Sequence, residues 1–315
     1  MYIKNCKSKY TAMKPFIPLF TILFLAAALF SVSDTYSQET VEYYQHSFST
    51  SSGKTFKADT DLGNINVTGS SSNVVNILVN GNPDYKNDFN ISANESSDGI
   101  DLKITFKEEK DHSYKNLSLK IDVTVPESYS LNLSTKGGNI KANNIRGEIG
   151  IATYGGNIKM NSITGNTMLT TKGGNIAINN IRGDLNAFTD GGNVLVDAFT
   201  GNVKTQTKGG NITLAGSDGA IDAVTFGGNI SLDYLGSNMG MNLKTMAGNI
   251  SAKIPESTSA DVKISTTVGK IVSDLITPEK ADQYSTSSNA SGKINGGGNM
   301  ITIETNAGNV HLSKK

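Results

Sequence analysis

The acidic side chains of this sequence are the first candidates for chemistry, because carboxylates hold metal ions and catalyse hydrolysis. Asp197 and Asp233 stand at a position that recurs every 18 residues, and three other recurrences carry Asn143, Asn161 and Asn179. A calcium-binding β-roll needs a carboxylate in each half-coil, within the pattern Gly-Gly-x-Gly-x-Asp. Because the acids here are too sparse for that pattern, the sequence predicts no metal site and no cofactor.

The spacing of acids and histidines also argues against catalysis. Glycoside hydrolysis needs two carboxylates that project together. Asp190 instead has Lys172 and Lys208 at the neighbouring recurrences, which is typical of a surface ion pair. The chain has three histidines, all outside the regular repeat: His46, His112 and His311. We therefore predict no catalytic residues and no enzymatic activity, with a carbohydrate-active β-helix that binds or cleaves polysaccharide as the alternative.

Three aromatic residues are the candidates for ligand binding. Tyr154 and Phe226 share one outward position of the repeat, and Phe188 stands in the neighbouring outward position. Aromatic rings on a flat sheet can stack on sugars or dock a protein partner. Single exposed apolar residues are also normal on protein surfaces, which is the competing interpretation. We predict a binding face at these residues, for a surface glycan or a protein ligand.

A repeat of fixed length positions all of these side chains. A threonine stands two residues before each copy of the motif Gly-Gly-Asn-Ile/Val, and glycine also recurs every nine residues through the same region. A fixed period of this size indicates a chain that stacks one structural unit on the next. The six copies begin 18 residues apart, at Gly137, Gly155, Gly173, Gly191, Gly209 and Gly227.

Apolar residues alternate with polar ones inside each unit, as in half-buried strands. The pattern predicts an all-β, parallel β-solenoid (β-helix) of about 18 residues and two short strands per coil, with coils ~4.8 Å apart. The recurring apolar positions form three columns: Ile140, Ile158, Ile176, Val194, Ile212 and Ile230; Ala142, Met160, Ile178, Val196, Leu214 and Leu232; and Ile149, Thr167, Leu185, Val203, Ile221 and Met239.

The asparagine of each motif forms a further column. Stacked amides can hydrogen-bond along the axis of a solenoid and satisfy the backbone groups of its turns. We interpret this column as a structural ladder rather than a ligand-binding stripe. Its members are Asn139, Asn157, Asn175, Asn193, Asn211, Asn229 and Asn249.

The first 37 residues have the features of a secretory signal peptide. Four lysines precede an apolar run from Phe16 to Phe30, and Thr35 and Ser37 fit the small residues before a cleavage site. Cleavage after Ser37 would remove four of the 28 basic and one of the 28 acidic residues, leaving a net charge of −3 and no cysteine. We predict export without disulfides, no membrane span after cleavage, and no binding to nucleic acid.

The rest of the chain divides into three segments. Residues 38–134 are β-rich but less regular, residues 135–250 are the regular solenoid, and residues 251–315 are irregular terminal coils and a cap. In the first segment we expect strands at Val74–Val79, Gly99–Phe106 and Leu117–Val125, turns at Asn80-Gly81 and Asp98-Gly99, and a charged hairpin tip at Lys107–Asn116. The run from Thr60 to Ile65 matches the repeat motif, which predicts that this segment joins the same stack.

The repeat resembles a known bacterial family of domains of unknown function. The resemblance rests on the recurrent Thr-x-Gly-Gly-Asn-Ile coil, the leader, Ile254-Pro255-Glu256, and the closing motifs that end at Ile271 and Val310. The family's members are labelled "putative adhesins" and are related to auto-transporter-adhesin-like "head GIN" domains. The resemblance spans about residues 40–312 and implies a right-handed β-solenoid, export and an adhesive role.

From these features we expect an exported, non-enzymatic solenoid that acts as an adhesin or envelope scaffold and binds through its repetitive side faces. Its final location would be the periplasm, the outer surface or the medium. An accessory module for envelope sensing or regulation is a further alternative. The sequence names neither the ligand nor the oligomeric state.

Overall fold

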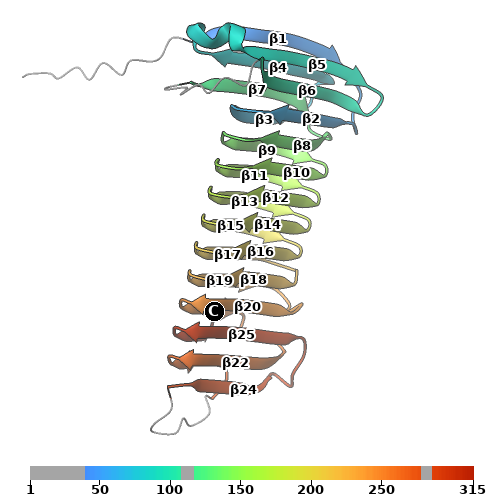
Figure 1. Cartoon of the computed structure of the whole chain (residues 1–315). Helices are drawn as coiled ribbons and strands as arrows, with labels where there is room; N and C mark the ends of the chain where they lie inside the picture. Colours follow the sequence, from blue (N-terminus) through green and yellow to red (C-terminus); the bar gives the residue numbers. More distant parts are fainter. Residues whose placement is uncertain (1–39, 108–116, 278–285) are drawn as a thin grey trace, which may run out of the picture. The chain divides into compact units, whose positions relative to one another are not determined.

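The computed structural model describes residues 40–107, 117–277 and 286–315, all of which belong to one compact unit, Gln38–Lys315. The predicted signal peptide and most of the predicted hairpin tip lie outside the described residues. Strands of the unit stack one beside the next in two long sheets (Figure 1). The prediction of an all-β, mostly parallel solenoid is confirmed.

The regular part contains two strands per coil, one in each sheet. From β8 to β19 each strand pairs in parallel with its equivalent 18 residues away, so that identical positions of the repeat lie side by side. Strands β20 and β21 pair in the same way with β18 and β19, at an interval of 20 residues. The strands are β8 (Ser130–Thr135), β9 (Ile140–Arg146), β10 (Ile149–Thr153), β11 (Ile158–Thr164), β12 (Thr167–Thr171), β13 (Ile176–Arg182), β14 (Leu185–Thr189), β15 (Val194–Thr200), β16 (Val203–Thr207), β17 (Ile212–Ser217), β18 (Ile221–Thr225), β19 (Ile230–Leu235), β20 (Met241–Ala247) and β21 (Ile250–Ile254).

The core lies between the two sheets and runs the length of the stack. The first two predicted apolar columns are buried throughout. The third column contains one error, because Met239 is 55% exposed and Met241 pairs with Ile221 in its place. The interval from Ile230 to Met241 is two residues longer than the equivalent interval from Ile212 to Ile221, and this insertion moves Met239 out of the core.

At the N-terminal end, strand order departs from chain order. The described elements are β1 (Val41–Ser49), β2 (Thr55–Thr60), β3 (Asn64–Ser70), β4 (Val74–Gly81), the 3-10 helix η1 (Pro83–Asp88), β5 (Phe89–Ser96), β6 (Gly99–Phe106) and β7 (Leu119–Pro126). The coil of β2 and β3 lies against β8 and β9, as the motif from Thr60 to Ile65 predicted. The predicted turn at Asn80-Gly81 is wrong, since both residues pair with β7 inside β4. Antiparallel strands β1, β4 and β5 close this end.

The C-terminal end is also rearranged. Its strands are β22 (Ala260–Val268), β23 (Ile271–Ser273), β24 (Ser288–Ile294), β25 (Met300–Ala307) and β26 (Val310–Lys314). The last coil of the chain, β25 and β26, lies directly against β20 and β21, and the earlier coil of β22 and β23 stacks outside it. Figure 1 shows β25 between β20 and β22, with the antiparallel strand β24 beyond them.

The strands form two sheets, sheet A and sheet B. Sheet A runs β1-β4-β7-β3-β9-β11-β13-β15-β17-β19-β21-β26-β23. Sheet B runs β24-β22-β25-β20-β18-β16-β14-β12-β10-β8-β2-β6-β5. Both sheets have 13 strands, so each presents a long outer face of side chains.

Candidate functional site

Buried threonines fix the turns that carry two of the candidate binding residues, Tyr154 and Phe226. Thr207 Oγ1 donates a hydrogen bond of 2.8 Å to the carbonyl of Gly192, in the preceding coil, and accepts one of 3.2 Å from the N–H of Gly210. The same pair of bonds recurs at Thr153, Thr171, Thr189 and Thr225. Since each hydroxyl joins two coils, the residue after each threonine is held at a fixed place on the outside of the turn.

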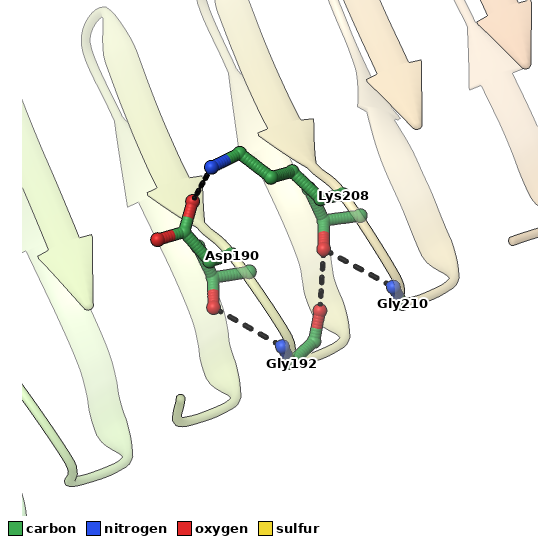
Figure 2. Close-up of polar contacts among 6 residues, drawn as sticks. Asp190, Gly192, Lys208 and Gly210 are labelled. Atoms are coloured by element: carbon green, nitrogen blue, oxygen red, sulfur yellow. Dashed lines mark hydrogen bonds and ion pairs between the residues drawn. The ribbon is translucent and has the colours of Figure 1, made fainter. Parts of the chain in front are cut away.

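The residues that follow these threonines form a column that is charged at one end and apolar at the other. Lys208 Nζ lies 2.8 Å from Asp190 Oδ1, as the spacing predicted (Figure 2). Lys172 Nζ lies 4.4 Å from the ring centroid of Tyr154 and forms a cation–π contact instead. Beyond Lys208 the column continues with Phe226 and Met246, which are both exposed.

The structure does not bring the three predicted binding residues together. Tyr154 is 57% and Phe226 44% exposed, and they lie four coils apart, or ~19 Å at the normal strand spacing. Phe188 is half-buried on the outer face of sheet B, two coils from each of them. No ring contact joins the three in the described residues. They therefore do not form a single aromatic platform.

The asparagine column forms a continuous chain of hydrogen bonds. Asn157 N–H donates to Asn139 Oδ1 at 2.9 Å, and its side-chain amide donates to the same oxygen at 3.1 Å. Equivalent backbone bonds join the next members through Asn249. The ladder also includes Asn64 at one end and Asn309 at the other. These side-chain oxygens are used within the turns, which is the arrangement expected of a structural element.

A long hollow on the outer face of sheet B is the feature that the aromatic pattern did not indicate. One part has a volume of about 560 Å³ and another about 450 Å³, and Asn186 of β14 lines both. Both parts lie along the starting ends of the sheet B strands, and together they are called the sheet B groove. Its outward side chains include Asn132, Met168, Asn186, Lys204, Asp222, Asn242 and Thr302.

The charged groups of the groove largely neutralise one another. Lys204 Nζ lies 3.6 Å from Asp222 Oδ2, and Asn242 Nδ2 donates to Asp222 Oδ1 at 2.7 Å. At the edge, Lys244 Nζ lies 3.0 Å from Glu304 Oε2. Asp184 Oδ1 accepts a hydrogen bond from the N–H of Asn202 in the next turn. The groove is thus polar without a strong field of either sign.

A metal site is not evident among the described residues, where no group of three or more His, Cys, Asp and Glu side chains converges. Asp233, one of the acids considered for calcium, pairs with Lys315 Nζ at 2.6 Å. In the same described ranges, no helix is long and apolar enough to cross a membrane.

Comparison with known proteins places the chain in a family. Residues 57–313 match the model of a family described as Toastrack DUF4097. The chain belongs to the Toastrack DUF4097 family. No curated protein matches this Toastrack chain. The resemblance to a family of unknown function is therefore confirmed, and the narrower relation to "head GIN" domains stays a prediction.

Several solved structures are similar to this Toastrack chain at low identity. A "putative adhesin" from Bacteroides fragilis is 15% identical, with a TM-score of 0.46, over 89% of this chain and 98% of its own. A "putative cell adhesion protein" from Clostridium sporogenes is 12% identical, with a TM-score of 0.33, over 88% and 100%. A "putative lipid binding protein" from Parabacteroides distasonis is 14% identical, with a TM-score of 0.36, over 86% and 96%. At such values these likenesses carry no argument about function.

Sequence reasoning missed the groove in this Toastrack chain because its residues share no motif. Asn132, Gly150, Met168 and Asn186 occupy one outward position of four successive coils, and their types differ. The available signal was Gly150, which has no side chain beyond a hydrogen atom and stands between Asn132 and Met168 of the neighbouring coils. This glycine indicates a hollow only when the neighbouring strands are known, and the apolar periodicity does not report on outward positions.

Proposed function

We propose that the protein is an exported, adhesin-like interaction protein of the bacterial cell envelope, without enzymatic activity, that binds its partners on the side faces of the solenoid. The observation that carries the proposal is the extent of uncovered sheet surface. Within the described residues the one helical element is η1, so no layer of helices covers the outer faces of the two 13-stranded sheets. Such faces offer a large rigid surface, which suits recognition of an extended partner better than enclosure of a small substrate.

Export is supported by the leader. Lys4, Lys7, Lys9 and Lys14 precede the apolar run, and small residues follow it, which is the order of charge, hydrophobicity and cleavage site in a secretory signal. The lack of cysteine after residue 6 is compatible with an exported fold that is stabilised by stacking rather than by disulfides.

The rigidity of the side faces supports a binding role. All but the four edge strands of the two sheets pair on both sides, and buried threonines and the asparagine ladder fix the turns. The binding surface therefore loses little conformational entropy when a partner binds, because it is already preorganised.

Two measurements test the proposal. Fractionation of cells that produce the tagged full-length chain, with N-terminal sequencing, should find the protein outside the cytoplasm and cleaved after Ser37. The purified protein should bind at least one ligand on an array of glycans and extracellular-matrix proteins. A Tyr154→Ala/Phe188→Ala/Phe226→Ala variant tests whether the aromatic residues contribute to that binding. Retention in the cytoplasm, or the lack of any bound ligand, would contradict the proposal and favour a structural or regulatory role.

A further inference from the structure

We infer that the sheet B groove is a binding site for a neutral polysaccharide whose chain lies along the axis of the stack. The inference rests on the proposed function and names its ligand class and location. The groove crosses β8, β10, β12, β14, β16, β18, β20 and β25, which are consecutive neighbours in sheet B. At ~4.8 Å per strand this is a length of ~34 Å, which suits an extended polymer rather than a single small molecule.

Unused amides in the groove supply the hydrogen bonds that a sugar needs. The side chains of Asn132, Asn166 and Asn186 make no hydrogen bond within the described parts of the chain. In the ladder, by contrast, the side-chain oxygen of each asparagine accepts from the next turn. A primary amide offers two donors and an acceptor. Free amides spaced along one face can therefore contact successive hydroxyl groups of a polymer.

The charges of the groove favour a neutral ligand. Three carboxylates and two ammonium groups line it, from Glu148, Asp184, Asp222, Lys204 and Lys244. Lys204 is paired with Asp222, and Lys244 with Glu304. Because both lining lysines are already paired and the acidic groups outnumber them, a uronate or sulfated polymer would find no free cation there.

Met168 in the groove and Phe188 beside it offer apolar surface to the apolar faces of sugar rings. Met168 is 57% exposed and lies beside Asn186 on the neighbouring coil. Phe188 follows Asn186 by two residues on the same face of β14; it is half-buried and lies outside the lining of the groove. An aromatic ring and a thioether beside free amides provide both stacking and hydrogen bonding near Asn186, which lines both parts of the groove.

An extended peptide fits the groove less well. Peptides that bind to sheets in extended form pair their backbone with an unpaired edge strand. The strands under the groove are interior strands that already pair on both sides, for example β14 with β12 and β16. Only side chains are available, and they match hydroxyl groups better than a peptide backbone that needs a continuous partner.

Gly150 allows the groove to be filled without disturbing the fold. A Cβ built at this position would come no closer than 3.9 Å to Asn132 Oδ1 and 4.0 Å to the carbonyl of Leu131. Gly150 stands in β10 between Asn132 and Met168, so a larger side chain there would occupy the space above the strand. Aromatic residues are favoured in strands, so Gly150→Trp should fold.

The experiment measures binding of the purified full chain to a soluble β-glucan, an α-mannan and a galactan, with polygalacturonate as the acidic polymer. We expect binding to a neutral polymer and at least tenfold weaker binding by Gly150→Trp and by Asn186→Ala. Two variants control for nonspecific effects: Gly173→Trp, at a turn with no atom within 4 Å of the added Cβ, and Asn179→Ala, an exposed amide of sheet A. Both should bind as the wild type does.

Three results would overturn the inference. They are binding of polygalacturonate alone, binding of a neutral polymer that Gly150→Trp leaves unchanged, and no binding of any neutral polymer. If the protein nevertheless binds another ligand on the glycan and matrix array, the proposed function survives and only the groove assignment fails. Thermal unfolding of each variant shows whether a loss of binding reflects a loss of folding.

Discussion

Asn249 Oδ1 accepts a hydrogen bond of 2.8 Å from the backbone N–H of Asn309, which lies 60 residues further along the chain. Asn309 Oδ1 in turn accepts from the N–H of Lys270 at 2.9 Å. The ladder therefore follows the spatial order of the coils and not their order in sequence. It continues without interruption through the place where the last coil is inserted, so the same turn chemistry stabilises the regular and the rearranged parts of the stack.

Replacing one member in the middle of the ladder should lower stability. Asn193 Oδ1 accepts both from the backbone N–H of Asn211, at 2.8 Å, and from its side-chain amide, at 3.3 Å. We expect Asn193→Ala to lower the free energy of unfolding by about 1 kcal/mol, because it removes the acceptor of both bonds. The loss is modest because the bonds are exposed to solvent. Asn193→Asp keeps the acceptor and should cost less. Chemical denaturation of both variants tests this prediction. Equal losses of stability would show that the side-chain oxygen of residue 193 is not the stabilising group.

The two glycines of each motif should differ sharply in their tolerance of a side chain. A Cβ on Gly192 would lie 1.9 Å from the carbonyl oxygen of Gly174 in the preceding coil, whereas the nearest atom to one on Gly191 is 3.9 Å away. Gly192→Ala must separate two coils and should cost about 3 kcal/mol or more, while Gly191→Ala should cost under ~1 kcal/mol. Thermal unfolding of the pair is the measurement. Similar losses would mean that the coils can move apart at little cost.

Two buried threonines of β16 should respond in opposite directions to loss of the hydroxyl. Thr205 is 1% exposed, and its Oγ1 has no hydrogen-bond partner among the described residues, whereas Thr207 bonds to Gly192 and Gly210. Thr205→Val should stabilise the protein by about 1 kcal/mol, since an unsatisfied buried hydroxyl is removed at constant shape. Thr207→Val should destabilise it by about 2 kcal/mol. Denaturation midpoints that move in the same direction would contradict this assignment.

The regular half of the fold was predictable because its signals are local. Apolar alternation gives the buried face of each strand, and the interval of 18 residues gives the partner, so Ile158 pairs with Ile140 and Ile176 as expected. Even the first coil was predictable, from the match of Thr60–Ile65 to the motif. The error at Met239 arose where a loop of different length broke the interval.

The order of the terminal coils could not be predicted from the same signals. The motifs ending at Ile250, Ile271 and Val310 are alike, and nothing in their residues says that Val310 pairs with both of the others. Left-handed residues inside the strands of sheet A were hidden for a related reason. Asn144, Ser162, Asn180 and Ala198 all have φ of 57 to 59°, although only asparagine has a side chain that favours this conformation.

The groove was hidden because it depends on contacts between coils. The repeat motif identifies Asn193 as a member of the ladder, where its oxygen is used. Asn186 belongs to no motif, and only the structure shows that its amide makes no bond in the described residues. The pairing of Lys204 with Asp222 likewise appears only once β16 and β18 are known to be neighbours.

An acid-sensitive contact fastens the turn where the irregular coils meet the regular ones. Asp61 Oδ1 lies 2.7 Å from Lys136 Nζ, and Asp61 Oδ2 accepts from the N–H of Phe106 at 3.1 Å. Burial tends to raise the pKa of Asp61, but the hydrogen bonds from Lys136 and Phe106 and the nearby charges of Lys136 and Lys103 outweigh it and hold this pKa below the ordinary 3.8. The carboxylate therefore joins the turn after β2 to the end of β6 and to the turn after β8.

The sign of the shift sets the pH dependence that we predict for this contact. Because the folded state holds the Asp61 pKa below its unfolded value, the stabilisation is fully present above pH 3.8 and is lost as the pH falls through the folded pKa. Asp61→Asn keeps an acceptor for Phe106 but removes the charge. Since the side chain of Lys136 is 69% exposed, the loss at neutral pH should be no more than about 1 kcal/mol.

Thermal unfolding of wild type and Asp61→Asn between about pH 7 and pH 2.5 tests the prediction, since this range brackets the ordinary carboxyl pKa. The two melting curves should differ at neutral pH and converge below pH 3.8. Lys136→Gln removes the same ion pair from the other side and should show the same convergence, because it leaves the carboxylate without its main partner. A difference that persists unchanged to the lowest pH would mean that the amide perturbs packing at this turn and that the charge of Asp61 contributes nothing to the junction.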